Sequence, residues 1–248
     1  MIKVKAWNPF KGCKKFSSGC KNCYAYRFAE RLRESGNNDY NDGFDFKLLP
    51  DRLKKPFSEK KKSIFFVNSM GDLFYERMSF NYIDKILNVI EATDHIYMIL
   101  TKRAERMRLY FGNSKLPKNL MVGVTVENIS YKHRIDILRS INAYIKFISF
   151  EPLLGYIKDI DLGGIDWAIV GGETGAYARP MSLLSAKNIL QMCKKYNVSF
   201  YFKQYGTFLD KKCIKDRFNL SSYKEYPQKL VELVNYQAYS LFERMGQD

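Results

Sequence analysis

The sequence has little histidine and no long hydrophobic run, and each absence removes a class of protein. Only two of the 248 residues are histidines, and neither His95 nor His133 has a partner at the spacing of a metal site, so we assign them no role. No apolar stretch approaches the about 20 residues that a membrane-spanning helix needs. The first residues also lack the pattern of a signal peptide. We therefore expect a cytoplasmic protein without a membrane partner.

Acidic residues are also few. The chain has 26 Asp and Glu against 41 Lys and Arg, which gives a formal net charge of +15. With 18 Tyr and 18 Phe beside this charge, the composition favours a nucleic-acid partner, because phosphates meet cations and bases stack on aromatic rings. It does not distinguish DNA from RNA. The alternative is that many of the lysines are simply solvated surface residues.

Hydrophobic periodicity predicts an α/β fold in one large domain. From residue 63 onward, short β-branched or aromatic runs alternate with helical stretches, which is the pattern of βα units around a parallel sheet. We expect a TIM-like (β/α) barrel, full or partial, over residues 1–206, with residues 207–248 as a C-terminal extension packed on it. The alternative for the helical segment of this extension is contact with a protein partner. The expected strands are Ile2–Ala6, Phe44–Leu49, Ser63–Asn68, His95–Leu100, Met121–Thr125, Tyr144–Ser149, Asp166–Gly171 and Ser199–Lys203, and the expected helices are Tyr24–Ser35, Phe80–Ala92, Arg103–Tyr110, Ser130–Ile141, Leu183–Tyr196 and Gln228–Met245.

Three of the five cysteines lie close together near the start of the chain. Cys13, Cys20 and Cys23 form the pattern C-x₆-C-x₂-C. Thiolates are soft ligands that suit iron–sulfur clusters and zinc, so these residues predict a metal site. A structural zinc site would need a fourth protein ligand, and Cys213 is a candidate only if the tail folds over the site. Cys193 lies on the inner face of an expected helix, where we expect it to be a small buried apolar residue.

Polar residues follow nearly every expected strand. In (β/α) barrels the chemistry gathers at the carboxyl ends of the strands, so these residues are candidates for the lining of an active site. Glycines there let the backbone approach a ligand closely, and Lys and Arg can meet a carboxylate or phosphate. The candidates for catalysis are Lys102, Glu127, Glu151 and Lys203, those for cofactor binding are Asn68, Asp72, Thr125, Gly171, Gly172 and Glu173, and Arg103 and Arg179 are further candidates for binding an anion.

Three thiolate ligands would leave one iron of a four-iron cluster open to a small molecule. Together with the polar barrel rim, this suggests S-adenosylmethionine (SAM), bound to the open iron through its amino and carboxylate groups. Reductive cleavage of SAM would then produce a 5′-deoxyadenosyl radical. We therefore expect a [4Fe–4S] cluster and SAM as cofactors.

Between Trp7 and Gly206 the chain contains the motifs WNPFKGCKKFSSGCKNCYA, NSMGDLF, LTKR, GVTVEN, SFEPLLG, WAIVGGETG with ARPM, and FKQYG. Together they resemble a phage- and prophage-associated family of unknown function, the three-cysteine-motif proteins, which is related to the radical SAM superfamily. The resemblance implies a radical SAM-like barrel whose three cysteines hold a [4Fe–4S] cluster, and an enzyme acting on nucleic acid or a modified nucleotide. The usual superfamily spacing is C-x₃-C-x₂-C, whereas the first gap here is six residues.

Two other functions fit parts of the sequence. One is a nucleic-acid-binding module in which the cysteines hold a structural zinc ion or cluster, without SAM chemistry. The other is metal-assisted hydrolysis in which Asp72, Glu127 and Glu151 bind a hard cation. The spacing of these three carboxylates does not mark a metal site, so we rank hydrolysis last.

Overall fold

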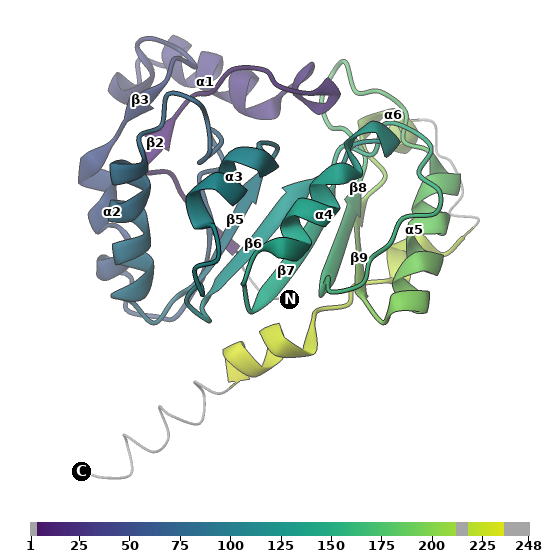
Figure 1. The fold of residues 1–248 in the computed structure, drawn as a ribbon. Helices are drawn as coiled ribbons and strands as arrows, with labels where there is room; N and C mark the ends of the chain where they lie inside the picture. Colours follow the sequence, from purple (N-terminus) through teal and green to yellow (C-terminus); the bar gives the residue numbers. More distant parts are fainter. Residues whose placement is uncertain (1–3, 212–217, 236–248) are drawn as a thin grey trace.

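A parallel sheet of seven strands, curled into a half-barrel, forms the centre of the protein (Figure 1). The computed structural model describes residues 4–211 and 218–235, without the side chains of 210 and 211. Each strand lies parallel to its neighbours, and β1 and β9 are the edges of the sheet. In spatial order the strands are β1 (Val4–Trp7), β4 (Ile64–Val67), β5 (Ile96–Thr101), β6 (Leu120–Thr125), β7 (Ile145–Phe150), β8 (Trp167–Gly171) and β9 (Ser199–Gln204).

Helices cover the outer face of the sheet, and α1 lies across the carboxyl ends of the strands (Figure 1). Two of the outer helices begin at serine caps: the Ser79 hydroxyl accepts from the Tyr82 amide, and the Ser182 hydroxyl accepts from the Ser185 amide. The α-helices are α1 (Tyr24–Glu34), α2 (Phe80–Glu91), α3 (Ala104–Phe111), α4 (His133–Ser140), α5 (Leu183–Tyr196) and α6 (Thr207–Lys211).

The strands send alternate side chains to two separate cores. In β5, Tyr97 and Ile99 join the large core between sheet and helices, while Ile96 and Met98 face the inside of the half-barrel. This alternation is the period of two expected of a strand. Because both faces are apolar, the strands are nearly continuous hydrophobic runs, as in sheets that are covered on both sides.

The sequence left both a full and a partial barrel open, and the structure has the partial one, with seven strands in its main sheet. The segment Phe44–Leu49 does not enter the large sheet. Its residues Lys47–Leu48 form β3, which pairs antiparallel with β2 (Phe10–Lys11) in a separate two-stranded sheet. Since β1 pairs directly with β4, the chain between them forms the cysteine segment, α1 and this small sheet instead of a further barrel strand.

The tail covers part of the inner face of the half-barrel. Lys224 forms an antiparallel bridge with Tyr201 of β9, and residues 228–235 are helical. Leu230 is buried in the inner core with strand residues such as Met121 and Trp167. Of the expected helix Gln228–Met245, residues 236–245 lie outside the described part of the chain.

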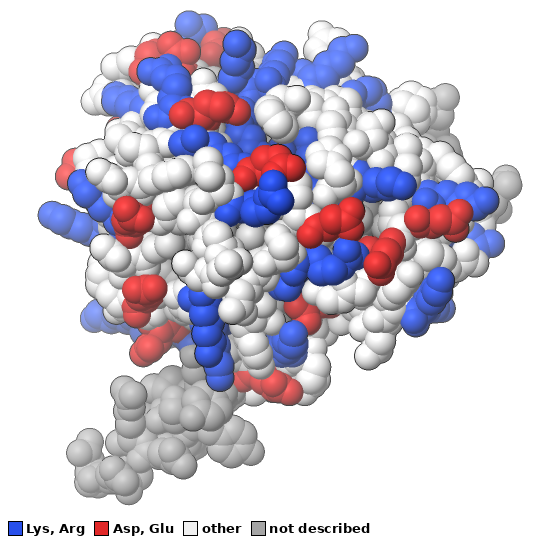
Figure 2. All heavy atoms as spheres, in the orientation of Figure 1, with Lys and Arg blue, Asp and Glu red and all other residues white. Residues whose placement is uncertain are grey.

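The surface is basic, but its charges are mixed. Figure 2 shows Lys and Arg over most of one face, with Asp and Glu interspersed among them, so the net charge is not gathered into one patch on that face. Within residues 4–211 and 218–235, no helix is both long and apolar enough to cross a bilayer.

Candidate functional site

The cysteine loop, residues 12–23, connects β2 to α1 over the carboxyl ends of the strands. It begins at Gly12, whose φ of +80° suits glycine and whose amide donates to the Met70 carbonyl at 2.7 Å. A Cβ at this position would lie 2.3 Å from the Phe44 carbonyl oxygen. Cys20 ends a short 3₁₀ helix, and Cys23 is the residue before the first turn of α1. Local backbone geometry therefore shapes both ends of the loop.

The three cysteines of the loop line one cavity of about 310 Å³. All are partly exposed and none forms a disulfide. Burial and the nearby Asp72 carboxylate raise the pKa of Cys13 to about 12, against the opposing effect of Arg103, and the other two thiols add to the rise. The described residues contain no group of three His, Cys, Asp or Glu side chains arranged around one ion position.

Glu127, at the end of β6, holds the middle of the cysteine loop. Its side chain is fully buried and forms an ion pair of 3.0 Å with Arg134, of which 2% is exposed. The other carboxylate oxygen accepts from the Ser17 hydroxyl. A Cβ on Gly19 would lie 2.6 Å from this carboxylate, so the loop rests directly on Glu127.

Glu173, after β8, holds the same loop from the other side. It accepts two side-chain hydrogen bonds from Arg179, at 2.9 and 2.6 Å, and one from the Asn22 amide at 2.9 Å. Burial alone would raise the pKa of Glu173, but the bonds from Arg179 and Asn22 outweigh it and hold the pKa below its usual range. Arg179 also donates to the Ser18 carbonyl at 3.0 Å.

Asp72, in the turn after β4, forms a third pair of this kind. Its carboxylate accepts from the Thr101 hydroxyl at 2.6 Å, the Lys102 amide at 3.1 Å and the Arg103 guanidinium at 3.2 Å. Arg103 donates in turn to the Lys14 carbonyl of the loop at 2.9 Å. Three acid–arginine pairs from three parts of the sheet thus fasten the cysteine loop. Arg103 and Arg179, expected to bind an anion, are paired with carboxylates of the protein itself.

A second cavity, of about 250 Å³, opens at the carboxyl ends of the strands below the loop. Lys203 forms a 3.0 Å ion pair with Glu151 there, and Lys102 lies 3.5 Å from the Thr125 hydroxyl. Eight of the predicted site residues line this carboxyl-end pocket: Cys20, Cys23, Lys102, Thr125, Glu151, Gly172, Glu173 and Lys203. Because Cys20 and Cys23 also line the first cavity, the two cavities are neighbours.

The carboxyl-end pocket continues towards the inside of the half-barrel. An apolar pocket of about 280 Å³ shares five of its lining residues, and its other walls are mostly aromatic or aliphatic. The shared residues are Phe66, Leu100, Ser149, Glu151 and Lys203. Charged groups therefore stand at the mouth, with an apolar interior behind them.

Gly171, the last residue of β8, and Gly172 after it make room for different groups. A Cβ on Gly171 would lie 2.8 Å from the Glu151 carboxylate, so this position leaves room for that side chain. A Cβ on Gly172 would lie 2.0 Å from the Tyr205 carbonyl, so this position lets two backbone segments meet.

Asn68 is buried in the turn after β4 with a φ of +64°. Its amide, in the orientation that satisfies both of its groups, bonds the Phe10 carbonyl and the Gly71 amide.

Four of the predicted site residues are not among the described residues that line the carboxyl-end pocket: Asn68, Asp72, Glu127 and Gly171. The hydrogen bonds of the three polar side chains shape the turn or the loop.

Cys193 is buried in α5 as expected, and burial raises its pKa far above the usual range. Cys213 lies outside the described residues. Sequence reasoning did not identify Ser17, Asn22 or Arg134.

The fold and the site define an α/β half-barrel protein with a three-cysteine loop over the carboxyl ends of its strands. The model of one family, described as a protein of unknown function (DUF5131), matches residues 3–238. The chain therefore belongs to this family. Neither the curated proteins nor the solved structures include a match to it.

Proposed function

We propose that the protein is a radical SAM-like iron–sulfur enzyme that acts on a nucleic acid or nucleotide-type substrate. The observation that carries this proposal is the shared position of Cys20 and Cys23. With Cys13 they line one cavity, and the same two residues line the pocket at the carboxyl ends of the strands. A metal group held by the three thiolates would therefore be next to a molecule bound in that pocket.

The donor set fits a [4Fe–4S] cluster with one iron left for SAM. Three cysteines surround the cavity, and soft thiolates are the ligands that such clusters take. When bound and reduced, the cluster would supply the electron that cleaves SAM. Within the protein, the three acid–arginine pairs would keep the loop in one shape, which is how indirect contacts orient metal ligands.

The carboxyl-end pocket offers groups for the polar parts of SAM or of a nucleotide. Lys203 is more than half exposed beside Glu151, so this pair can bind a carboxylate through the lysine and an amino or hydroxyl group through the glutamate. Lys102 adds a second positive group to the lining of this pocket. The apolar interior, with Trp167 and Tyr201 among its walls, suits a flat ring system.

The test is metal analysis and SAM turnover with anaerobically purified, reconstituted protein. We expect about four iron and four sulfide per chain, and release of 5′-deoxyadenosine when dithionite and SAM are added. Cys20→Ala should lose both. Cys193→Ala, which removes a buried cysteine far from the loop, should keep both.

Other results would overturn the proposal. One metal ion per chain without sulfide, and no 5′-deoxyadenosine from folded protein, would instead support a nucleic-acid-binding module with a structural metal. Folded protein that takes up neither metal nor sulfide would exclude both functions.

A further inference from the structure

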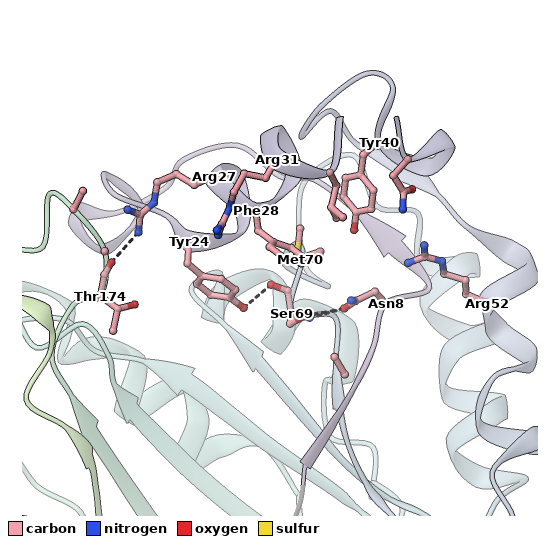
Figure 3. A pocket seen from close by; sticks show the side chains of 15 residues that line it. Asn8, Tyr24, Arg27, Phe28, Arg31, Tyr40, Arg52, Ser69, Met70 and Thr174 are labelled. Carbon is pink, nitrogen blue, oxygen red and sulfur yellow. Dashed lines mark hydrogen bonds between the residues drawn. The ribbon is translucent and has the colours of Figure 1, made fainter. Parts of the chain in front are cut away.

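A larger cavity, of about 840 Å³, lies beneath α1 (Figure 3). Its walls come from α1, from the ends of β1 and β4, from residues 37, 40 and 52 in the segment after α1, and from residues 174–176 after β8. Its charged residues are all arginines, namely Arg27, Arg31 and Arg52, and no Asp or Glu is among the described residues that line it. We refer to it as the arginine pocket. Its charge favours an anion.

The three guanidinium groups are only partly occupied by the protein. Arg27 donates one bond to the Thr174 carbonyl at 2.8 Å, and its buried Nε has no partner among the described residues. For Arg31, the contact within the described residues is with the Phe28 ring, 5.7 Å away. Arg52 is paired with Asp39. Two of the three arginines therefore retain donors for an anion such as a phosphate, whose oxygens a guanidinium can bind with two parallel hydrogen bonds.

Exposed aromatic rings accompany these arginines. Tyr24 and Phe28, on the first turns of α1, are 54% and 44% exposed and line the same cavity. The Tyr24 hydroxyl donates to the Ser69 carbonyl at 2.6 Å, which fixes the ring (Figure 3). Exposed rings beside a positive groove are how proteins bind single-stranded nucleic acids without reading the sequence, because every base has a face that can stack. A free phosphate or a lipid headgroup has no base that could stack on these rings.

The arginine pocket is adjacent to the carboxyl-end pocket. Tyr24 and Thr174 line both cavities. A strand with a phosphate at Arg27 or Arg31 would pass over Tyr24, and its next nucleotide would reach the pocket beside Cys20. The loop and helix between the two cavities are basic, since residues 14–33 contain six Lys or Arg and one Glu.

We propose that the arginine pocket binds the sugar–phosphate backbone of a single-stranded nucleic acid and directs one nucleotide into the carboxyl-end pocket. The fate of that nucleotide rests on the proposed function. Binding of the strand does not, because no cysteine is among the described residues that line the arginine pocket.

The experiment measures binding of labelled 12-nucleotide DNA and RNA strands to the full chain by fluorescence anisotropy at several salt concentrations. Arg31→Gln should weaken binding about three- to tenfold and lower the slope of log K against log salt by about 1. Combined with Arg27→Gln the loss should be larger. Arg108→Gln, at an exposed arginine of α3 that is not among the described residues lining these cavities, removes the same charge and should leave binding unchanged.

Cys13→Ala separates this inference from the proposed function, because Cys13 is among the described residues lining the cavity of the three cysteines but not among those lining the arginine pocket or the carboxyl-end pocket. If this variant binds the strands as well as the wild type, and Arg31→Gln does not, the arginine pocket binds nucleic acid whatever the cysteines hold. Wild-type affinity in the double arginine variant would overturn the inference. So would full displacement of the strand by inorganic phosphate at an equal concentration of phosphate groups, or binding only to vesicles of anionic lipid. DNA and RNA arms that differ in affinity would identify the sugar that the site prefers.

Discussion

Glu127 and Arg134 form the most deeply buried ion pair of the site, yet neither is among the described residues that line its cavities. An ion pair gains stability in the interior only when both partners are present, because each charge has lost its water. The Ser17 hydroxyl donates a hydrogen bond to the other oxygen of the Glu127 carboxylate. Glu127, expected from the sequence to be catalytic, is thus placed to position the cysteine loop.

Glu127→Gln should reduce the free energy of unfolding by about 3 kcal/mol, since it leaves the Arg134 charge buried without a counter-charge. The matched control is Glu105→Gln, which breaks an ion pair with Arg108 whose partners are 65% and 59% exposed. That change should cost at most about 0.5 kcal/mol. Urea unfolding of both variants measures the difference. Equal, small losses would show that Glu127 does not stabilise the fold.

At the scale of elements, the cysteine loop has little regular structure of its own, and most of its shape comes from distant parts of the chain. Arg179 bonds both Glu173 and the Ser18 carbonyl of the loop, beside the direct bond from Asn22 to Glu173. Arg179→Gln should therefore speed amide hydrogen exchange in residues 14–23 by about tenfold, which corresponds to about 1.4 kcal/mol. Arg139→Gln is the control, because Arg139 has similar exposure and bonds the Gly163 and Asp161 carbonyls away from the loop.

The same experiment has a pH dependence. Folding lowers the pKa of Glu173, so its contribution to stability is complete above the ordinary carboxyl pKa of about 4.3 and is lost only as the pH falls through the lower value of the folded state. The wild-type loop should stay protected at pH 5 to 8 and approach the exchange rate of Arg179→Gln only in stronger acid. Protection that disappears near pH 5 would contradict the role given to Glu173.

The sequence predicts the elements well where local pattern determines them. The helix over Leu183–Tyr196 has the predicted bounds, because a serine cap and a regular apolar stripe define it. Phe44–Leu49 alternates like a strand, but alternation does not say which sheet a strand joins, and its partner is Phe10–Lys11. Of the ten residues that the strand-end rule proposes for catalysis or cofactor binding, six line the carboxyl-end pocket: Lys102, Thr125, Glu151, Gly172, Glu173 and Lys203. The rule could not distinguish Glu151, which lines the pocket, from Glu127, which does not. The role of Glu127 depends on its contacts with Ser17 and Arg134, and nothing in the sequence marks these two residues as its partners.

At the scale of the whole molecule, an open half-barrel exposes an inner apolar face that a closed barrel would fill. Residues 224–235 cover part of this face, and Leu230 is buried there. Residues 224–235 are therefore part of the folded core, although no motif marks them in the sequence.

Leu230→Ala should lower the free energy of unfolding by about 2–4 kcal/mol, as large-to-small changes in a core do. Leu109→Ala, at a mostly exposed leucine of α3, should have almost no effect. Thermal unfolding of the two variants gives the comparison. If they melt alike, the tail does not contribute to the core.

The contacts that fasten the cysteine loop span most of the chain. Ser17 meets Glu127, 110 residues later, and Ser18 meets Arg179, 161 residues later. A ribosome must therefore have made about three-quarters of the protein before the loop has all of its supports, and long-range contacts form late. The thiols at the beginning of the chain are the first part of the site to emerge and the last to be held in place.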